Sequence, residues 1–168
     1  MKWAIIILVM MSLVGSMMWV LPSKRERFQA QLRQLAMRKG FNVQLAQVKP
    51  PRASGEIEQE SFNSPVYRLP RTNISRKERE GFIQWQVYKQ VALAAEGLPE
   101  GWCWGEGERK LSESQLEQLS VLISDLPEGA VAIESDPVHL SVFWDERGDL
   151  NDLDRIQDAM QSVIEEKF

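Results

Sequence analysis

A run without any charged side chain opens the chain and constrains its fold more than any other feature. Residues 3–21 read WAIIILVMMSLVGSMMWVL, about 19 residues that would form roughly 28 Å of α-helix. The hydrocarbon core of a bilayer is ~30 Å thick. Trp3 and Trp19 stand near the two ends, where indole side chains prefer the headgroup region. The run therefore predicts a transmembrane helix over 3–21 rather than a buried core helix, which a chain this short could hardly cover.

The basic side chains that follow this run indicate which end of the predicted helix faces the cytoplasm. Only Lys2 and the amino terminus precede the run, and an excess of Lys and Arg marks the cytoplasmic flank of a span. We expect residues 1–2 to form an extracytoplasmic tip and the rest of the chain to stay in the cytoplasm. The cations that set this topology and contact lipid headgroups are expected to be Lys24, Arg25, Arg27, Arg33, Arg38 and Lys39. The alternative is that these six basic residues are exposed to water and contact no lipid.

Two further interpretations of the run concern cleavage and self-association. A cleaved signal peptide has an apolar segment of ~7–15 residues followed by small residues at the cleavage site. Here the small residues Ser12, Gly15 and Ser16 lie inside a longer run, which favours an uncleaved anchor over export. Ser12 and Ser16 also have small-xxx-small spacing beside Gly15, which would let two helices approach closely and form a homodimer.

Composition excludes several classes of site. The 168 residues contain one Cys and one His, so neither an internal disulfide framework nor a zinc site of Cys and His ligands is expected. Bases dominate residues 22–52 and acids dominate beyond residue 91, giving a net charge of −4. The acidic part would repel phosphates, so we expect no nucleic-acid partner. We likewise expect no metal and no cofactor.

Local signals predict the elements before residue 65. Ser23-x-x-Glu26 has the spacing of a capping box, and Gly40 suits the left-handed position that ends a helix. We therefore expect a basic amphipathic helix within 22–40. The alternation of Phe41, Val43 and Leu45 predicts a strand at the start of the segment 41–52, and the polar residues 53–64 predict a loop.

Residues 65–168 predict one small acidic α+β domain. We expect a short strand at 66–69, a short helix after Ser75, a helix after Ser112, a hairpin from 130–135 and 138–144, and a last helix from Asp149. Residues 82–91 favour a strand, with a helix as the alternative, because their apolar spacing fits both. In the hairpin, Val131 and Ile133 are expected to face the core. The predicted fold class is therefore α+β, in which the N-terminal transmembrane helix continues into the basic helix and helices pack on one face of a small antiparallel sheet.

No residue pattern predicts catalysis. His139 is the only histidine, and no partner that would make it a general base is evident from the sequence. In the segment PEGWCWGEGERK (99–110), Trp102 and Trp104 flank Cys103. These indoles either contact a protein partner, since tryptophan is enriched at binding hot spots, or fill the core with Cys103 as a small buried apolar residue. Redox chemistry at Cys103 is the least favoured interpretation.

The first quarter of the chain resembles a known family. After the apolar run come LPSKRER at 21–27, a helical pattern at 31–37 and the pair Lys39-Gly40. This order resembles the small single-pass accessory subunit of the bacterial preprotein translocase, the YajC-like family. That family's Gly-rich small β domain has no counterpart after residue 41. The resemblance implies an accessory protein of the bacterial inner membrane that faces the cytoplasm, and it carries over no catalytic residues.

These patterns together predict a non-catalytic domain that acts by protein–protein interaction, as an accessory or scaffold subunit of a membrane complex. The acidic part of the chain is the expected contact surface, together with the segment 99–107. Two alternatives stay open at this point: a periplasmic protein released by signal cleavage, and a membrane-tethered enzyme.

Overall fold

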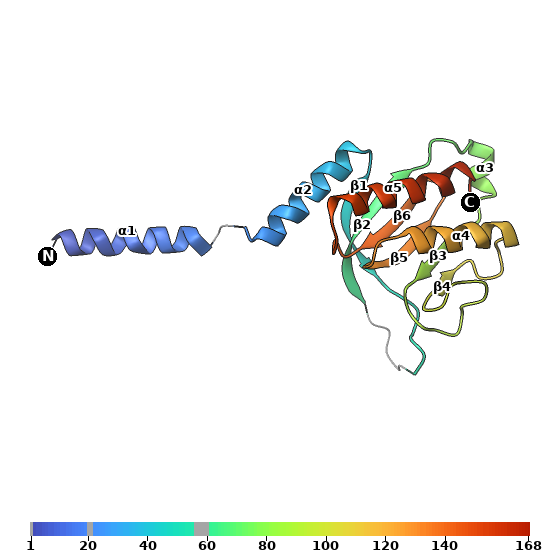
Figure 1. The fold of residues 1–168 in the computed structure, drawn as a ribbon, viewed down its shortest axis with the longest axis horizontal. Coiled ribbons are helices and arrows are strands. Elements are labelled where there is room, and N and C mark those ends of the chain that lie inside the picture. Colours follow the sequence, from blue (N-terminus) through green and yellow to red (C-terminus); the bar gives the residue numbers. More distant parts are fainter. Residues whose placement is uncertain (1, 20–21, 56–60) are drawn as a thin grey trace. The chain divides into compact units, whose positions relative to one another are not determined.

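The computed structural model describes residues 2–19, 22–55 and 61–168. The chain divides into two compact units, residues 1–32 and 33–168. Figure 1 shows the order of the elements along the chain. The second unit holds every strand of the described residues.

The helix near the start of the chain corrects one prediction. Among the described residues, no helix is long and apolar enough to cross a membrane, so the predicted transmembrane helix over 3–21 is wrong. Helix α1 (Lys2–Trp19) begins with a charged residue, and its uncharged part amounts to roughly 25 Å, short of the ~30 Å hydrocarbon core. Residues 20 and 21 of the predicted span lie outside the described part of the chain.

Helix α2 (Lys24–Arg38) begins and ends at the predicted residues. The Ser23 amide donates to Glu26 Oε2 at 2.6 Å, and the Glu26 amide donates to Ser23 Oγ at 3.3 Å. At the other end, the Gly40 and Phe41 amides donate to the carbonyls of Met37 and Ala36. Gly40 has φ +91°, which glycine adopts without steric cost. The predicted basic helix within 22–40 is therefore confirmed.

Six strands of the described residues form one antiparallel sheet in the order β1-β2-β6-β5-β3-β4. The strands are β1 (Asn42–Val48), β2 (Phe62–Pro70), β3 (Trp85–Tyr88), β4 (Cys103–Glu106), β5 (Ala130–Ser135) and β6 (His139–Trp144). The α+β class and the hairpin are confirmed. Strand β2 begins inside the predicted loop 53–64, whereas β3 is shorter than the predicted 82–91.

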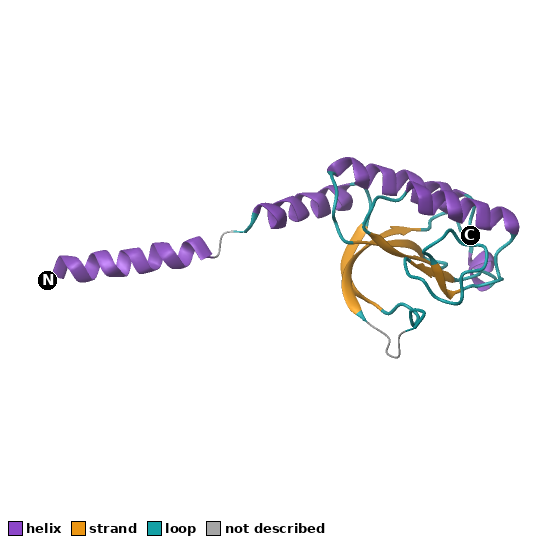
Figure 2. Cartoon of the chain, turned by 60° about the horizontal axis from the view of Figure 1, so that its bottom comes forward, coloured by secondary structure: helices purple, strands orange, loops and turns teal. Residues whose placement is uncertain are grey.

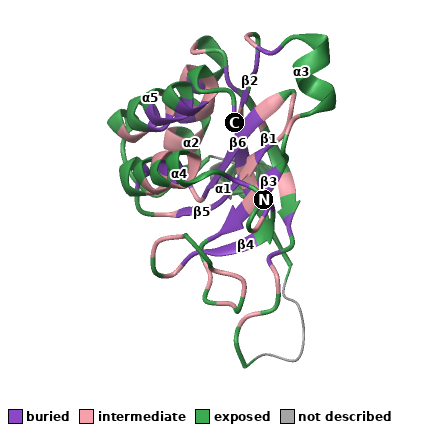
Figure 3. Cartoon of the chain, turned by 90° about the vertical axis from the view of Figure 1, so that its right-hand side faces the viewer, coloured by how far each residue is buried: buried purple, intermediate pink, exposed green. Residues whose placement is uncertain are grey.

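The three later helices are α3 (Arg76–Glu80), α4 (Glu113–Asp125) and α5 (Leu150–Glu165). Helices α3 and α4 begin directly after the predicted caps Ser75 and Ser112, and α5 begins directly after Asp149. The side chains of all three residues form capping boxes. Helices α4 and α5 lie on one face of the sheet (Figure 2). The buried side of each helix is turned towards the strands (Figure 3). Their buried residues are Leu119, Leu122, Leu153, Ile156, Ala159, Met160 and Val163.

The opposite face of the sheet carries a second apolar cluster. It consists of Val48, Val66, Tyr88, Cys103, Ala132 and Phe143. Ala92, from the segment that follows β3, packs against it. Val131 also packs here, because a register shift between Ala130 and Ala132 moves it out of the alternation with Ile133. The prediction that Val131 faces the same core as Ile133 is therefore wrong.

A buried carboxylate joins Arg33, the first residue of the second unit, to the sheet. The Glu146 side chain has no solvent exposure, and Arg33 binds it with both Nε (2.6 Å) and Nη2 (2.8 Å). The hydroxyl of buried Tyr67 in β2 donates to the same carboxylate at 2.9 Å. Burial, followed by the charge of Glu146, raises the pKa of Tyr67, so this hydroxyl keeps its proton and remains a donor.

We expect Arg33→Met to lower the free energy of unfolding by about 2–3 kcal/mol, because it leaves a buried carboxylate without its cation. The loss stays below the ~3–5 kcal/mol of a fully buried pair because the Arg33 side chain is 43% exposed. Urea unfolding of the full chain, followed by tryptophan fluorescence, measures it. Arg25→Met, on an exposed residue of the same helix, is the matched control. Equal stability of the two variants would contradict this role of Glu146.

Candidate functional site

The structure separates the six predicted headgroup-binding cations. Four of them are exposed on α2: Lys24, Arg25, Arg27 and Arg38. Arg33 binds Glu146, and Lys39 forms an ion pair with Asp154. The last two cations therefore stabilise the fold, a role that the sequence analysis missed. Among the predicted anchor residues, the Trp3 side chain is exposed on α1 and the Trp19 side chain lies outside the described part.

The small residues of α1 are exposed. Neither Ser12 nor Ser16 is covered, and the Ser16 hydroxyl donates to the carbonyl of Leu13 at 2.9 Å. A side chain added at Gly15 would meet open space. Homodimerisation through these residues stays a prediction.

The two tryptophans of the 99–107 segment are buried. Trp102 and Trp104 are covered by the domain, and Trp104 Nε1 donates to the carbonyl of Glu96 at 2.9 Å. Cys103 lies between them in the apolar cluster, and burial raises the pKa of its thiol. A buried thiol with a raised pKa is a poor nucleophile. This geometry favours the interpretation that the indoles fill the core over the interpretation that they contact a partner.

His139 lies beside one carboxylate, which is already engaged. Its Nδ1 is 4.0 Å from Asp136 Oδ2. The other oxygen of Asp136 accepts the amides of Val138 and His139 at 2.6 and 2.7 Å, and so closes the hairpin turn. Within the described ranges, no group of three or more His, Cys, Asp or Glu residues could hold a metal ion.

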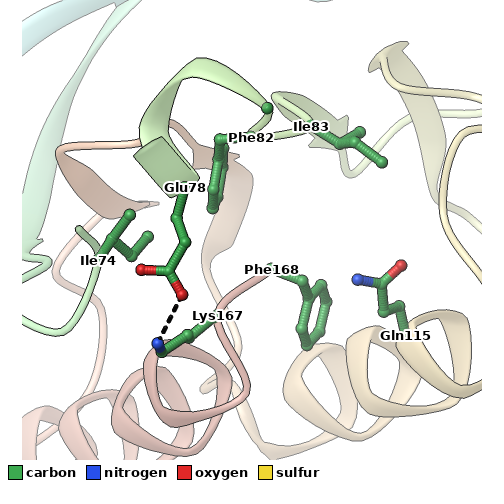
Figure 4. A pocket seen from close by; sticks show the side chains of 8 residues that line it. Ile74, Glu78, Phe82, Ile83, Gln115, Lys167 and Phe168 are labelled. Atoms are coloured by element: carbon green, nitrogen blue, oxygen red, sulfur yellow. Dashed lines mark hydrogen bonds and ion pairs between the residues drawn. The ribbon is translucent and has the colours of Figure 1, made fainter. Parts of the chain in front are cut away.

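A pocket that the sequence analysis did not identify lies beside α3 (Figure 4). Its volume is about 350 Å³. The pocket brings together three segments: residues 74–83 around α3, the first turn of α4, and residues 167–168. The lining residues are Ile74, Glu78, Gly81, Phe82, Ile83, Gln115, Lys167 and Phe168. The sequence contains one local indication of this pocket, the Ser75–Glu78 capping box followed by the apolar residues Phe82 and Ile83. The pocket also requires Phe168, which is distant in the sequence and could not be placed by local patterns.

The rim of the pocket carries one ion pair. Lys167 Nζ is 2.8 Å from Glu78 Oε1, and the Ser75 amide donates to Glu78 Oε2 at 2.7 Å. The hydrogen bond from Lys167, followed by those from Ser75, lowers the pKa of Glu78 to about 2. Glu78 is therefore ionised near neutral pH and too weak a base to abstract a proton efficiently.

The walls of the pocket are aromatic and are held from behind by a buried arginine. Phe168 stacks on Trp85 with ring centroids 6.1 Å apart, and the Arg71 guanidinium lies 4.9 Å from the centre of the Phe82 ring. Arg71 Nη2 donates to Ser135 Oγ at 2.8 Å and to the Phe168 carbonyl oxygen at 2.5 Å. Arg71 thus holds both aromatic walls in place.

Burial of Arg71 leaves part of its hydrogen-bonding capacity unused. The residue is 2% exposed, and desolvation lowers its pKa to about 10. Its Nε and Nη1 atoms have no hydrogen-bond partner among the described residues. The guanidinium therefore stays positively charged near neutral pH, and oxygen atoms of Ser135 and Phe168 accept its hydrogen bonds.

The surroundings of the pocket are suited to binding rather than to catalysis. Phe82 and Ile83 are partly exposed, and helix α3 carries the exposed cations Arg76, Lys77 and Arg79. An apolar cavity with a few charged groups at its rim is the usual form of a site that holds one anchoring side chain.

We expect Lys167→Met to raise the pKa of Glu78 from about 2 towards its ordinary value of 4.5. The carboxylate then loses the partner that favours its charged form. In the unmodified chain the lowered pKa stabilises the fold above pH 4.5, and this contribution is lost as the pH falls towards about 2. Titration of the Glu78 carboxyl by NMR measures the pKa in both proteins. Lys110→Met, at a distant Lys–Glu pair, is the control; a Glu78 pKa that Lys167→Met leaves unchanged would contradict the role of the rim pair.

In comparisons with known proteins, no family model, no curated protein and no solved structure matches this chain. The resemblance of the first quarter of the chain, from the apolar run through Gly40, to the translocase accessory subunit therefore stays a prediction.

Proposed function

We propose that the chain acts by protein–protein interaction, and that its domain holds an apolar side chain of a partner in the α3 pocket. The observation that carries the proposal is the pocket itself, whose Phe82 and Phe168 walls are fixed by a buried arginine while Ile83 stays exposed. Pockets with apolar walls receive many of the side chains that dominate an interface.

The size and charge of the pocket narrow the class of partner. Its volume of about 350 Å³ is at the lower end of the ~300–1,000 Å³ of ligand sites, and therefore suits one or two side chains. Burying a Leu or Phe side chain contributes about 1.5–3 kcal/mol. The exposed cations of α3 favour a partner segment in which acidic residues flank the apolar anchor.

The same geometry weighs against an enzyme. The side chains that could act as a nucleophile, acid or base have structural roles outside the pocket. Cys103 lies in the core, Glu146 forms an ion pair, and Asp136 closes the hairpin turn. Glu78, the acid at the pocket, is held as a carboxylate by Lys167. Binding of a partner side chain requires no free acid, base or nucleophile in the pocket.

Site-specific photo-crosslinking in cells tests the proposal. A photoreactive residue at Ile83, which is 40% exposed, is compared with one at Leu93, which is 99% exposed and lies outside the pocket. We expect a discrete crosslinked protein from position 83 alone, and we expect Lys77→Glu to reduce its yield severalfold by removing charge complementarity. Identical products from the two positions would contradict a partner in this pocket.

A further inference from the structure

The two edge strands of the sheet differ in how the chain covers them. Strand β4, at one edge, has only four residues. The Trp104 amide donates to the carbonyl of Ala94 at 2.7 Å, and Trp104 Nε1 donates to the carbonyl of Glu96 at 2.9 Å. Strand β4 therefore already has a backbone partner on the side that faces away from β3.

Strand β1, at the other edge, has a partner on one side only. It pairs with β2 over residues 42–48 without a register shift. Among the described residues, no hydrogen bond from outside β2 reaches the backbone of these seven positions. Their sequence, NVQLAQV, contains neither a charged residue nor a proline, which are common means of protecting an exposed edge. The outer side of β1 is therefore open to another strand.

The ladder determines which backbone groups of β1 point outwards. The Arg71 amide donates to the carbonyl of Val138, so these residues form a hydrogen-bonded pair that continues the β2–β6 register. Because hydrogen-bonded pairs alternate along antiparallel strands, the odd-numbered residues of β2 bond towards β6 and the even-numbered ones towards β1. The β1–β2 register pairs even positions with even positions. The amides and carbonyls of Val43, Leu45 and Gln47 therefore point away from β2, to the open edge.

This open edge is complementary to itself. Two antiparallel copies of β1 centred on Leu45 place each Leu45 opposite its counterpart, and Val43 opposite Gln47 of the second copy. All the outward amides and carbonyls of the three residues then have partners, whereas any other register leaves at least one of the three without a partner inside β1. The Leu45 side chain is 69% exposed, and no like charges meet, because residues 42–48 carry no charge.

We infer that the open edge of β1 binds β1 of a second copy of this chain, in an antiparallel pair centred on Leu45. The sheet then continues from one copy into the other across a two-fold axis. The inference goes beyond the proposed function, because β1 does not line the α3 pocket. One pair of short strands is small for an interface, so the dimer is weak and forms in a concentration-dependent way.

Cysteine crosslinking of the full chain tests the register, in a non-ionic detergent that covers the apolar residues of α1. Leu45→Cys chains should form dimers with a short thiol crosslinker, because facing residues lie about 5.5 Å apart. Gln47→Cys chains should not, because their thiols would be about 14 Å apart. A mixture of Val43→Cys and Gln47→Cys chains should crosslink, although neither does so alone.

The unmodified chain, whose Cys103 is buried, is the blank for this experiment. Equal yields from Leu45→Cys and from Gln47→Cys chains would show association without a defined register and would overturn the inference. The absence of any product from Leu45→Cys chains would overturn it as well.

A proline variant separates strand pairing from association through other surfaces. Leu45→Pro removes one outward amide hydrogen but no hydrogen bond to β2, because Leu45 faces Pro65 in a pair that forms none. We expect it to weaken dimer formation roughly tenfold in analytical ultracentrifugation, while tryptophan fluorescence shows an unchanged fold. Leu45→Val keeps the amide and should stay within about threefold. Dimer formation that Leu45→Pro leaves unchanged would contradict pairing through β1.

Two further measurements complete the design. Ile83→Glu, at the α3 pocket, should leave dimer formation unchanged, so failure of the proposed function and failure of this inference are distinguishable. A photoreactive residue at position 45 should capture a second copy of the chain in cells. Capture of a different protein alone would assign the edge to a strand of that protein and would overturn the inference of a homodimer.

Discussion

The buried carboxylate of Glu146 is the interaction on which the second unit depends most. It lies without solvent exposure and accepts hydrogen bonds from Arg33 and from Tyr67 in β2. A buried charge is tolerated only when its partners are close and well oriented. Segments that lie 113 positions apart in the chain are therefore held together by one side chain.

A second buried ion, Arg71, is satisfied in a different way. Glu146 binds the Arg33 side chain, whereas Arg71 binds oxygen atoms of Ser135 and Phe168 and lies over the ring of Phe82. The first arrangement joins elements of the fold. The second supports the walls of the α3 pocket.

Local signals predicted the helices and strands well. The capping boxes at Ser23, Ser75 and Ser112 each form, because a cap depends on residues only three positions apart. The hairpin and the last helix are also where the pattern of apolar residues predicted them. Apolar composition alone was a weaker guide: it predicted a membrane span at 3–21, but the helix that forms there falls short of one.

The sequence by itself determined where α2, α3, α4 and α5 begin, the hairpin and the absence of any disulfide framework, since these follow from neighbouring residues and from composition. Only the tertiary structure decided that Arg33 neutralises Glu146, that a register shift moves Val131 to the other face, and that Phe168 completes a pocket with α3. Each of these depends on contacts between distant segments. Such contacts follow from the packing of the whole sheet, which no local spacing of residues encodes.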